Sequence, residues 1–212
     1  MHEGSQPGRF FAHGPTATHP ASAMTNDKNA LRARLRAVRR SLSDDARAAA
    51  HRTMAAQLLC LVETLPPGGV IALYASAPDE ADPRGLLVVL PAAKVAWPRV
   101  VGPELELAVC KEADLVPGFR GILEPPAHIE PIGVSQVRLI VVPGLGFDRH
   151  GYRLGQGGGH YDRLLARLRA TAHPGLVVGL AYASQIVADV PREAHDQGVD
   201  LIVTEQGLVH DP

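Results

Sequence analysis

Residues 139–165 read LIVVPGLGFDRHGYRLGQGGGHYDRLL, and this stretch decides the fold class. Its first four residues, Leu139–Val142, form a continuous aliphatic run, which is typical of a strand covered on both faces. A glycine-rich loop follows, and residues Tyr161–Thr171 have the apolar pattern of a helix. Strand, loop and helix in this order predict an α/β protein, in which ligands bind where such loops leave the carboxyl ends of strands.

The rest of the chain repeats this alternation. Short aliphatic runs closed by Gly, Pro or polar residues predict strands at Val70–Tyr74, Val95–Trp97, Leu105–Val109, Leu139–Val142, Val177–Ala181 and Leu201–Val203. Helices are expected at Lys28–Leu65, with a break near Leu42–Asp45, and at Pro83–Leu90, Tyr161–Thr171 and Ser184–Val187. The pattern predicts one domain with an open sheet between helices, a three-layer α/β/α fold.

The amino-terminal residues differ in composition from the rest. Residues 1–24 are rich in Gly, Pro, Ser, Thr and His and have no hydrophobic period, so we interpret them as a disordered extension. Met24 is an alternative start, and Thr25, Asn26 and Asp27 offer side chains that cap a helix. We therefore expect residues 25–212 to form the single folded domain.

Composition and charge exclude several classes of protein. Apolar residues make up 46% of the 212 residues and the formal net charge is −1, so we expect no nucleic-acid or membrane partner. No apolar run reaches the ~20 residues that a membrane helix needs. Cys60 and Cys110 form no CxxC pair, which argues against a disulfide framework or a structural zinc site. These properties predict a cytoplasmic protein.

The glycine-rich loop has the features of a phosphate site. Backbone N–H groups approach a ligand closely where side chains are missing, and the helix that follows offers unsatisfied donors and the positive end of its dipole. Arg149 and Arg153 add charge. Neither GxxxxGK[ST] nor GxGxxG fits, because no Lys-Ser or Lys-Thr follows the glycines and position 160 is His. On glycine content alone, a flexible turn remains the alternative.

Cationic side chains recur in the first expected helix. Lys28, Arg32, Arg36 and Arg39 follow one another at spacings of 4, 4 and 3 residues, which puts them near one helix face. An ordinary solvated basic face is the alternative. A cation in the first turn opposes the helix dipole by a few tenths of a kcal/mol, and this cost favours a functional role for Lys28.

The same stretch carries a family resemblance. Pro143-Gly-Leu-Gly-Phe-Asp148 is followed by Gly151, Arg153-Leu-Gly155 and Gly157–Arg163, an order that resembles the signature of the 5-formyltetrahydrofolate cyclo-ligase family. His160 departs from the aromatic residue common there, and Gln156 stands at a variable position. Further similar stretches extend the resemblance over about residues 28–208: Lys28–Arg32, Asp79–Glu80, Trp97–Val100, Gly179–Tyr182 and Pro191–Asp196.

The resemblance implies an activity, a fold group and roles for individual residues. It implies ATP-dependent conversion of 5-formyltetrahydrofolate to 5,10-methenyltetrahydrofolate with release of ADP and phosphate, ATP and the folate as partners, and Mg²⁺ as cofactor. It also implies a fold grouped with ribose-5-phosphate isomerase and CoA-transferase-like proteins, and we expect a monomer. Catalytic roles fall to Arg153 and Lys28, and metal ligation to Asp162 and Asp196. The residues implied to contact the folate are Ala75, Glu80 and Tyr161. Those implied to bind ATP are Lys28, Arg32, Arg153, Leu154, Gly155, Gln156, Gly157, Gly158, Gly159, His160 and Tyr161.

Structural roles remain open for some of these residues. Asp162 in the first turn of a helix also stabilises the helix dipole, and Glu80 also suits a polar loop. Two other functions remain as alternatives, a non-enzymatic folate- or nucleotide-binding regulator and a sugar-phosphate isomerase. The presence of Arg153, Asp162 and Glu80 favours a catalyst over a regulator, and the isomerase reading does not explain Glu80 together with the basic helix.

Overall fold

The computed structural model describes residues 20–91 and 94–209, with side chains from Asp27 onward. Its largest sheet has eight strands in the order β13-β12-β10-β7-β1-β2-β3-β6. The five strands from β12 to β2 are parallel, while β13 and β3 run antiparallel to their neighbours. The bounds of the strands are β1 Val70–Ala72, β2 Val95–Val101, β3 Glu104–Val109, β6 Pro131–Ile132, β7 Val137–Pro143, β10 Leu176–Leu180, β12 Leu201–Thr204 and β13 Gly207–Val209.

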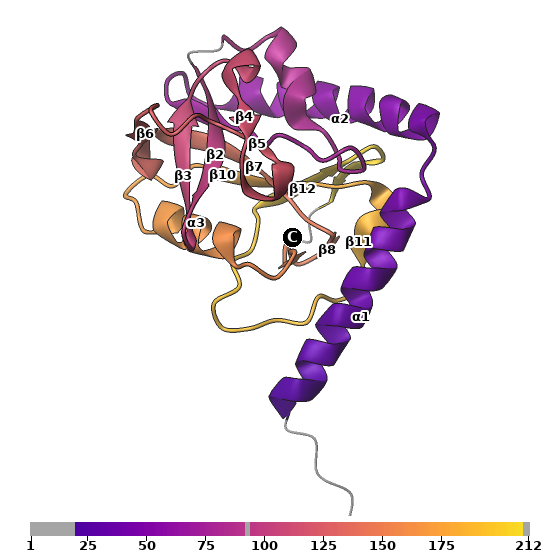
Figure 1. Ribbon diagram of the computed structural model, residues 1–212. Coiled ribbons are helices and arrows are strands. Elements are labelled where there is room, and N and C mark those ends of the chain that lie inside the picture. The colour runs from indigo at the N-terminus through magenta and orange to yellow at the C-terminus, as the bar shows by residue number, and fades with distance from the viewer. Residues whose placement is uncertain (1–19, 92–93, 210–212) are drawn as a thin grey trace, which may run out of the picture.

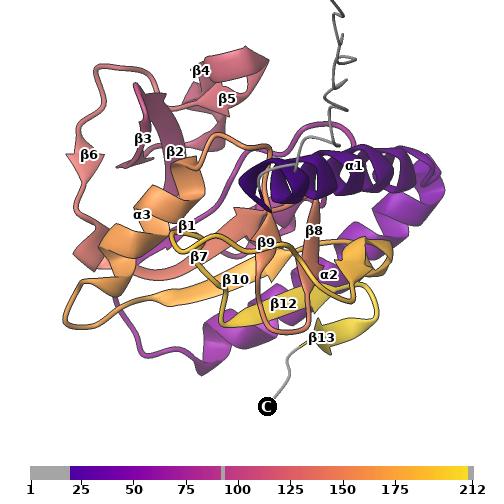
Figure 2. The ribbon, with the colours of Figure 1, turned by 90° about the horizontal axis from the view of Figure 1, so that it is seen from below.

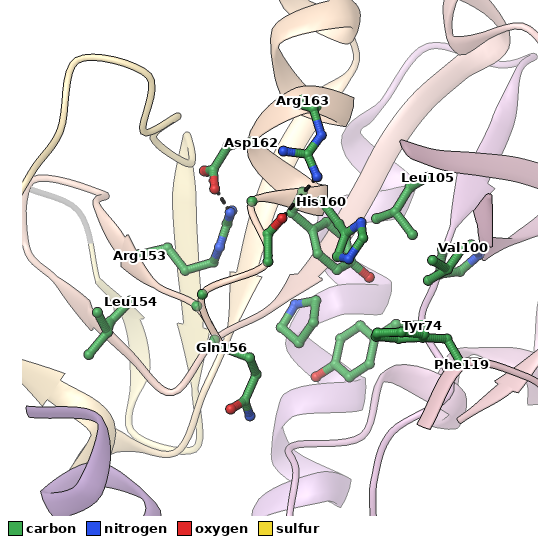
Figure 3. Close-up of a pocket in the computed structure, with 18 of the residues that line it drawn as sticks. Tyr74, Val100, Leu105, Phe119, Arg153, Leu154, Gln156, His160, Asp162 and Arg163 are labelled. Atoms are coloured by element: carbon green, nitrogen blue, oxygen red, sulfur yellow. Dashed lines mark hydrogen bonds and ion pairs between the residues drawn. The ribbon is translucent and has the colours of Figure 1, made fainter. Parts of the chain in front are cut away.

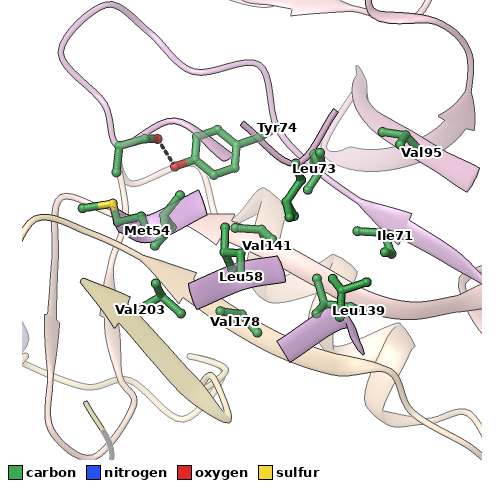
Figure 4. Packing of buried hydrophobic residues seen from close by; sticks show 14 of the residues in the cluster. Met54, Leu58, Ile71, Leu73, Tyr74, Val95, Leu139, Val141, Val178 and Val203 are labelled. Atoms are coloured by element: carbon green, nitrogen blue, oxygen red, sulfur yellow. Dashed lines mark hydrogen bonds between the residues drawn. The ribbon is translucent and has the colours of Figure 1, made fainter. Parts of the chain in front are cut away.

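The central strands are aliphatic because both of their faces are covered (Figure 1). Helix α2, Asp44–Thr64, packs Met54 and Leu58 on one face, and alternate residues of β7 contribute Leu139 and Val141 to that cluster. Figure 4 shows this packing. Helix α3, His160–Arg169, packs on the opposite face. There it buries Leu164, Leu165 and Leu168 against residues that include Ile140, Val142 and Val177. The expected three layers are therefore present.

Helix α1, Pro20–Arg40, lies outside these layers. It packs beside a small sheet of β8 Gly146–Asp148, β9 Arg153–Leu154 and β11 Ile186–Val187 (Figure 2). Among residues 27–40 of this helix, Leu35 is the one fully buried apolar residue, and it packs in a cluster with Leu145, Leu154 and Val190. With so small an apolar anchor, polar contacts must contribute much of what holds α1 in place.

Some sequence expectations need correction. Helix α1 begins at Pro20, before the expected caps at Thr25–Asp27, so residues 20–24 of the predicted extension are helical. Proline suits the first position of a helix, and Ala21 and Ala23 extend it at little cost. The remainder of that extension, residues 1–19, lies outside the described residues.

Two expected helices are shorter or different in type. Residues Pro83–Val88 form a 3₁₀ helix, η1, in which Gly85 packs so close to α2 that an added Cβ would lie 2.7 Å from the Cβ of Ala55. The expected helix Ser184–Val187 is a 3₁₀ turn, η6 Ala183–Gln185, followed by strand β11. The sequence also missed a hairpin of β4 Val116–Pro117 and β5 Leu123–Glu124. The other short elements are η3 Glu112–Asp114, η4 Phe119–Gly121 and η5 Val134–Gln136.

The expected break between the first two helices is confirmed, and it rests on a cap. Ser43 precedes α2, and its Oγ accepts a hydrogen bond from the Ala46 backbone at 3.2 Å. Replacing Ser43 by Ala should lower the free energy of unfolding by about 1 kcal/mol, since one helix N–H loses its partner. Urea unfolding measures the change, and Ser43→Asp, which keeps an acceptor, is the matched control. Equal stability of the alanine and wild-type proteins would contradict a capping role.

None of the helices within the described ranges combines the length and the apolar character that crossing a membrane requires.

Candidate active site

A cavity of about 430 Å³ opens at the carboxyl ends of β1 and β7. Its walls come from helix α1, the segment after β1, the segment after β7 with the glycine-rich loop, the start of α3 and the loop around Glu193–Asp196, together with residues of β2, β3 and the β4–β5 hairpin. Every site residue implied by the family resemblance lines this cavity, although their roles stay predictions, whereas Arg149, expected to add charge, does not line it. The implied site residues are Lys28, Arg32, Ala75, Glu80, Arg153, Leu154, Gly155, Gln156, Gly157, Gly158, Gly159, His160, Tyr161, Asp162 and Asp196.

The glycine-rich loop is shaped by backbone conformations that other residues adopt at a cost. Gly157 has φ of 100° and Gly159 has φ of 65°, and Gly159 is the residue that precedes the first turn of α3. An added Cβ at Gly159 would lie 2.9 Å from Nη1 of Arg163. The glycines therefore bring the loop and the amino end of α3 to the cavity with their N–H groups accessible.

Arg153 is buried at the centre of this wall (Figure 3). Its side chain is 3% exposed, and Nη2 donates to Oδ1 of Asp162 at 2.8 Å. Within the described part of the chain, Nη1 is buried without a hydrogen-bond partner. An unpaired buried donor on a cation is costly, so an anionic ligand in the cavity would gain a strong hydrogen bond there.

Helix α1 contributes two more cations to the cavity. Nζ of Lys28 contacts Oε1 of Glu193 at 2.8 Å and Oδ2 of Asp196 at 3.0 Å. Burial of the ammonium opposes its charge, but the hydrogen bonds to these two carboxylates raise the pKa of Lys28. Nε of Arg32 donates to the Gly155 carbonyl at 3.0 Å. The sequence predicted these cations, and Asp196 as a metal ligand, but not that Lys28 pairs with Glu193 and Asp196.

Acidic and aromatic side chains also line the cavity. Glu80 accepts hydrogen bonds from Nη1 of Arg39 and from the Ala77 backbone, each at 3.1 Å. Burial raises the pKa of Tyr161, with a further increase from Glu80 and an opposing effect of Arg153. Burial and the charge of Glu80 likewise raise the pKa of Tyr74, which donates to the Ala81 carbonyl. Both phenols therefore stay neutral at physiological pH.

An apolar wall completes the cavity, and the sequence did not reveal it. Val100 and Leu105 come from β2 and β3, and Phe119 and Ile122 from the β4–β5 hairpin (Figure 3). His160, the departure noted in the sequence, contacts the edge of the Phe119 ring at 5.8 Å between centroids. Isolated apolar residues in short elements have no pattern that separates a binding wall from a core, so only the tertiary structure identifies them.

The carboxylates fit Mg²⁺ held jointly with a ligand. Three or more metal-binding side chains do not gather anywhere in residues 27–91 and 94–209. Mg²⁺ commonly takes only one or two carboxylates together with phosphate oxygens and water. Oδ1 of Asp162 accepts from the Gln197 backbone at 3.2 Å, which brings Asp162 next to the segment that carries Asp196. Two carboxylates beside the glycine-rich loop therefore suit this ion.

Comparisons with known proteins agree on one family. The model of the 5-formyltetrahydrofolate cyclo-ligase family matches residues 24–205. The 5-formyltetrahydrofolate cyclo-ligase of Saccharomyces cerevisiae is 38% identical over 46% of this chain and 47% of its own length, so that match spans about half of the relative. The enzyme of the same name from Haemophilus influenzae is 28% identical over 81% of this chain and 94% of its own.

A solved structure extends the agreement to the fold. The NMR structure of 5,10-methenyltetrahydrofolate synthetase from Aquifex aeolicus superimposes with a TM-score of 0.70 and 34% identity. The alignment covers 86% of this chain and 92% of the other. A family match over most of the sequence and a shared fold over most of the structure lead to one conclusion: the chain belongs to the 5-formyltetrahydrofolate cyclo-ligase family.

Proposed function

We propose that this protein converts 5-formyltetrahydrofolate and ATP to 5,10-methenyltetrahydrofolate, ADP and phosphate. The observation that carries the proposal is the position of Arg153, which has an unpaired buried donor and lines the same cavity as Glu80. The unpaired donor of Arg153 suits a phosphate oxygen, and the carboxylate of Glu80 suits the N–H groups of a pterin. A single cavity with both features fits two substrates that must react with each other.

The nucleotide half of the proposed site is the glycine-rich loop with its cations. Backbone N–H groups of Gly157–Gly159 and the amino end of α3 would bind phosphate oxygens, and Arg153 and Arg32 would neutralise charge on them. Lys28 stays charged beside Glu193 and Asp196, at the edge of the same loop. In this proposal Lys28 turns from these carboxylates toward the phosphates when ATP binds.

The folate half of the proposed site lies between Glu80 and the apolar wall. The carboxylate would accept hydrogen bonds from the amino group and ring N–H of the pterin. Ala75 lines the same cavity, and Tyr161 stands between the two halves as a neutral aromatic side chain. The apolar wall would exclude water from the reacting atoms.

The proposed chemistry requires no nucleophilic side chain. A formamide oxygen is a poor leaving group, so the γ-phosphoryl group of ATP is transferred to it, which breaks the bond to ADP and forms a bond from phosphorus to that oxygen. The N10 amine then attacks the former formyl carbon and loses its proton, and phosphate leaves with the oxygen. The protein orients both substrates and neutralises the charge that develops on the phosphoryl oxygens, mainly through Arg153.

Mg²⁺ would be held by Asp162 and Asp196, and when bound it supplies positive charge beside the phosphate oxygens. Contacts within the chain give these two aspartates further roles. Asp162 orients Arg153 through the 2.8 Å hydrogen bond, and Asp196 holds Lys28 at 3.0 Å until the nucleotide is bound.

The activity is tested with purified protein, Mg²⁺, ATP and 5-formyltetrahydrofolate. We expect the absorbance of the methenyl product to rise and ADP to form in equal amount, because each ring closure consumes one phosphoryl transfer. Omitting ATP should abolish the product. Product formation without ATP consumption, or the absence of product from the complete mixture, would refute the proposal. Folate or nucleotide binding without turnover would instead support the regulator that the sequence left open.

We also propose the fold grouping that the family resemblance implied. The mostly parallel sheet with helices on both faces supports a grouping of this fold with ribose-5-phosphate isomerase and CoA-transferase-like folds. The monomeric state and the cytoplasmic location stay predictions.

A further inference from the structure

We propose that Arg39 is a positioning residue for Glu80, and that it fixes the carboxylate which receives the folate. The inference rests on the proposed function and adds to it a residue that does not line the cavity. Arg39 is 5% exposed at the last turn of α1. Its Nε and Nη2 contact both oxygens of Asp79, at 3.0 and 3.1 Å, while Nη1 reaches Oε1 of Glu80 at 3.1 Å.

Both oxygens of Glu80 are engaged, so the orientation of its carboxylate is set before a ligand arrives. The Ala77 backbone donates to Oε2 at 3.1 Å and closes a turn in which the Glu80 backbone donates to the Ala77 carbonyl at 2.9 Å. An arginine fork can bind two carboxylates at fixed angles, whereas a lysine can only attract them as a point charge. Arg39 therefore supplies direction as well as charge.

The backbone of Glu80 is held from its other side by a second contact. The hydroxyl of Tyr182 donates to the Glu80 carbonyl at 3.1 Å and lies 2.8 Å from Nε2 of His51. Burial raises the pKa of Tyr182 to about 12, against the opposing charges of Arg47 and Arg39, so the phenol keeps its proton. The main chain at Glu80 is thus fixed independently of Arg39, which leaves the carboxylate itself as the part that Arg39 controls.

The charges of this cluster favour a ligand with N–H donors. The guanidinium of Arg39 faces two carboxylates, Asp79 and Glu80. Two other arginines lie nearby: Arg40 is 74% exposed and 3.9 Å from Asp79, and Arg47 donates to backbone carbonyls that include that of Pro78. A planar heterocycle with adjacent N–H groups complements the carboxylate of Glu80, while a phosphate would be repelled by it.

A second contact of helix α1 allows the positioning role of Arg39 to be distinguished from a general structural role. Arg32, seven residues before Arg39, contacts the glycine-rich loop through the Gly155 carbonyl. Damage to the whole helix would therefore weaken ATP and folate binding together. Loss of the Glu80 orientation alone would weaken only the folate, which gives the inference a specific kinetic signature.

The test compares Arg39→Met with Arg40→Met, the neighbouring surface arginine, in the ATP-dependent assay. Arg39→Met should raise KM for 5-formyltetrahydrofolate by about tenfold or more, the value of a charged hydrogen bond, and leave KM for ATP near that of the wild type. Arg40→Met should change neither. Arg39→Lys should recover only part of the loss. An Arg39→Met enzyme with unchanged folate KM, or with equal losses for both substrates, would overturn the inference.

A double-mutant cycle with Glu80→Gln shows whether Arg39 acts through Glu80. In the Glu80→Gln background, Arg39→Met should cause no further rise in folate KM, because the carboxylate to be oriented is gone. A full additional loss would overturn the positioning role. Isothermal titration with the folate provides a readout without turnover. A wild-type protein that forms no product refutes the proposed function, whereas an active wild type with an unaffected Arg39→Met variant refutes only this inference.

Discussion

Replacing Arg153 by methionine is expected to lower kcat by about 10²–10³-fold, the range found when a preorganised charge-stabilising donor is removed. The guanidinium is 3% exposed, and its Nη1 is buried in the cavity wall with no hydrogen-bond partner among the described residues. This donor is already in place, so it would stabilise the charge that develops on the phosphoryl oxygens without reorganisation of the protein. Methionine keeps much of the side-chain volume and removes all the donors.

The matched control for this prediction is Arg149→Met. Arg149 lies four residues earlier, is exposed and does not line the cavity. Single-turnover kinetics with saturating ATP separate the chemical step from binding. Thermal unfolding of both variants measures the structural contribution, since Arg153→Met also leaves Asp162 without its ion pair. A kcat that stays within the range of the control, in a folded Arg153→Met protein, would contradict the proposed role.

Replacing Asp162 by asparagine should remove about 2–4 kcal/mol of transition-state stabilisation and lower kcat accordingly. This loss is smaller than or equal to the loss expected for Arg153→Met. Asparagine can still accept the hydrogen bonds that Oδ1 takes from Arg153 and the Gln197 backbone. The neutral amide lacks the negative charge that would hold a divalent cation and that balances the charge of Arg153. Folate affinity should change little, because the contacts of Asp162 are with Arg153 and the Gln197 backbone and not with Glu80.

A second readout distinguishes metal binding from helix stabilisation at Asp162. Titration of Mn²⁺ in the presence of ATP, followed by electron paramagnetic resonance, should show weaker cation binding in Asp162→Asn. If Asp162 serves only the dipole of α3, the variant should lose about 0.3–1 kcal/mol of stability and keep both its turnover and its cation affinity. Asp45→Asn, in the exposed first turn of α2, is a control for the dipole effect alone.

The parts of the site that the sequence pattern alone predicted are those encoded over short distances, whereas the binding roles of Lys28, Glu80 and Asp196 were expected only through the family resemblance. The glycine loop, Arg153 and Asp162 lie within ten residues, so their order identifies them and the strand–loop–helix pattern places them at one sheet end. The start of α1 was predicted eight residues too late, at Lys28 instead of Pro20, because caps at Thr25–Asp27 compete with a proline that also begins a helix.

The remaining parts depend on contacts between distant segments. Phe119 meets His160 across 41 positions of sequence, and nothing in the residues around Phe119 marks it as a cavity wall. Arg39 was visible as one of four cations on a helix face, but its partners Asp79 and Glu80 lie 40 and 41 residues away. Helical spacing predicts which side chains share a face and gives no information about what that face meets.

The contact between Lys28 and Asp196 joins residues separated by 168 positions. At a synthesis rate of 5–20 residues per second, the second residue is made about 8–30 s after the first. During that interval α1 has no carboxylate loop to close against, and its cations remain in water. Closing so long a segment costs chain entropy before any contact compensates for it. We therefore expect the cavity to be among the last parts of the molecule to form on the ribosome, after the strands up to β10 have already paired.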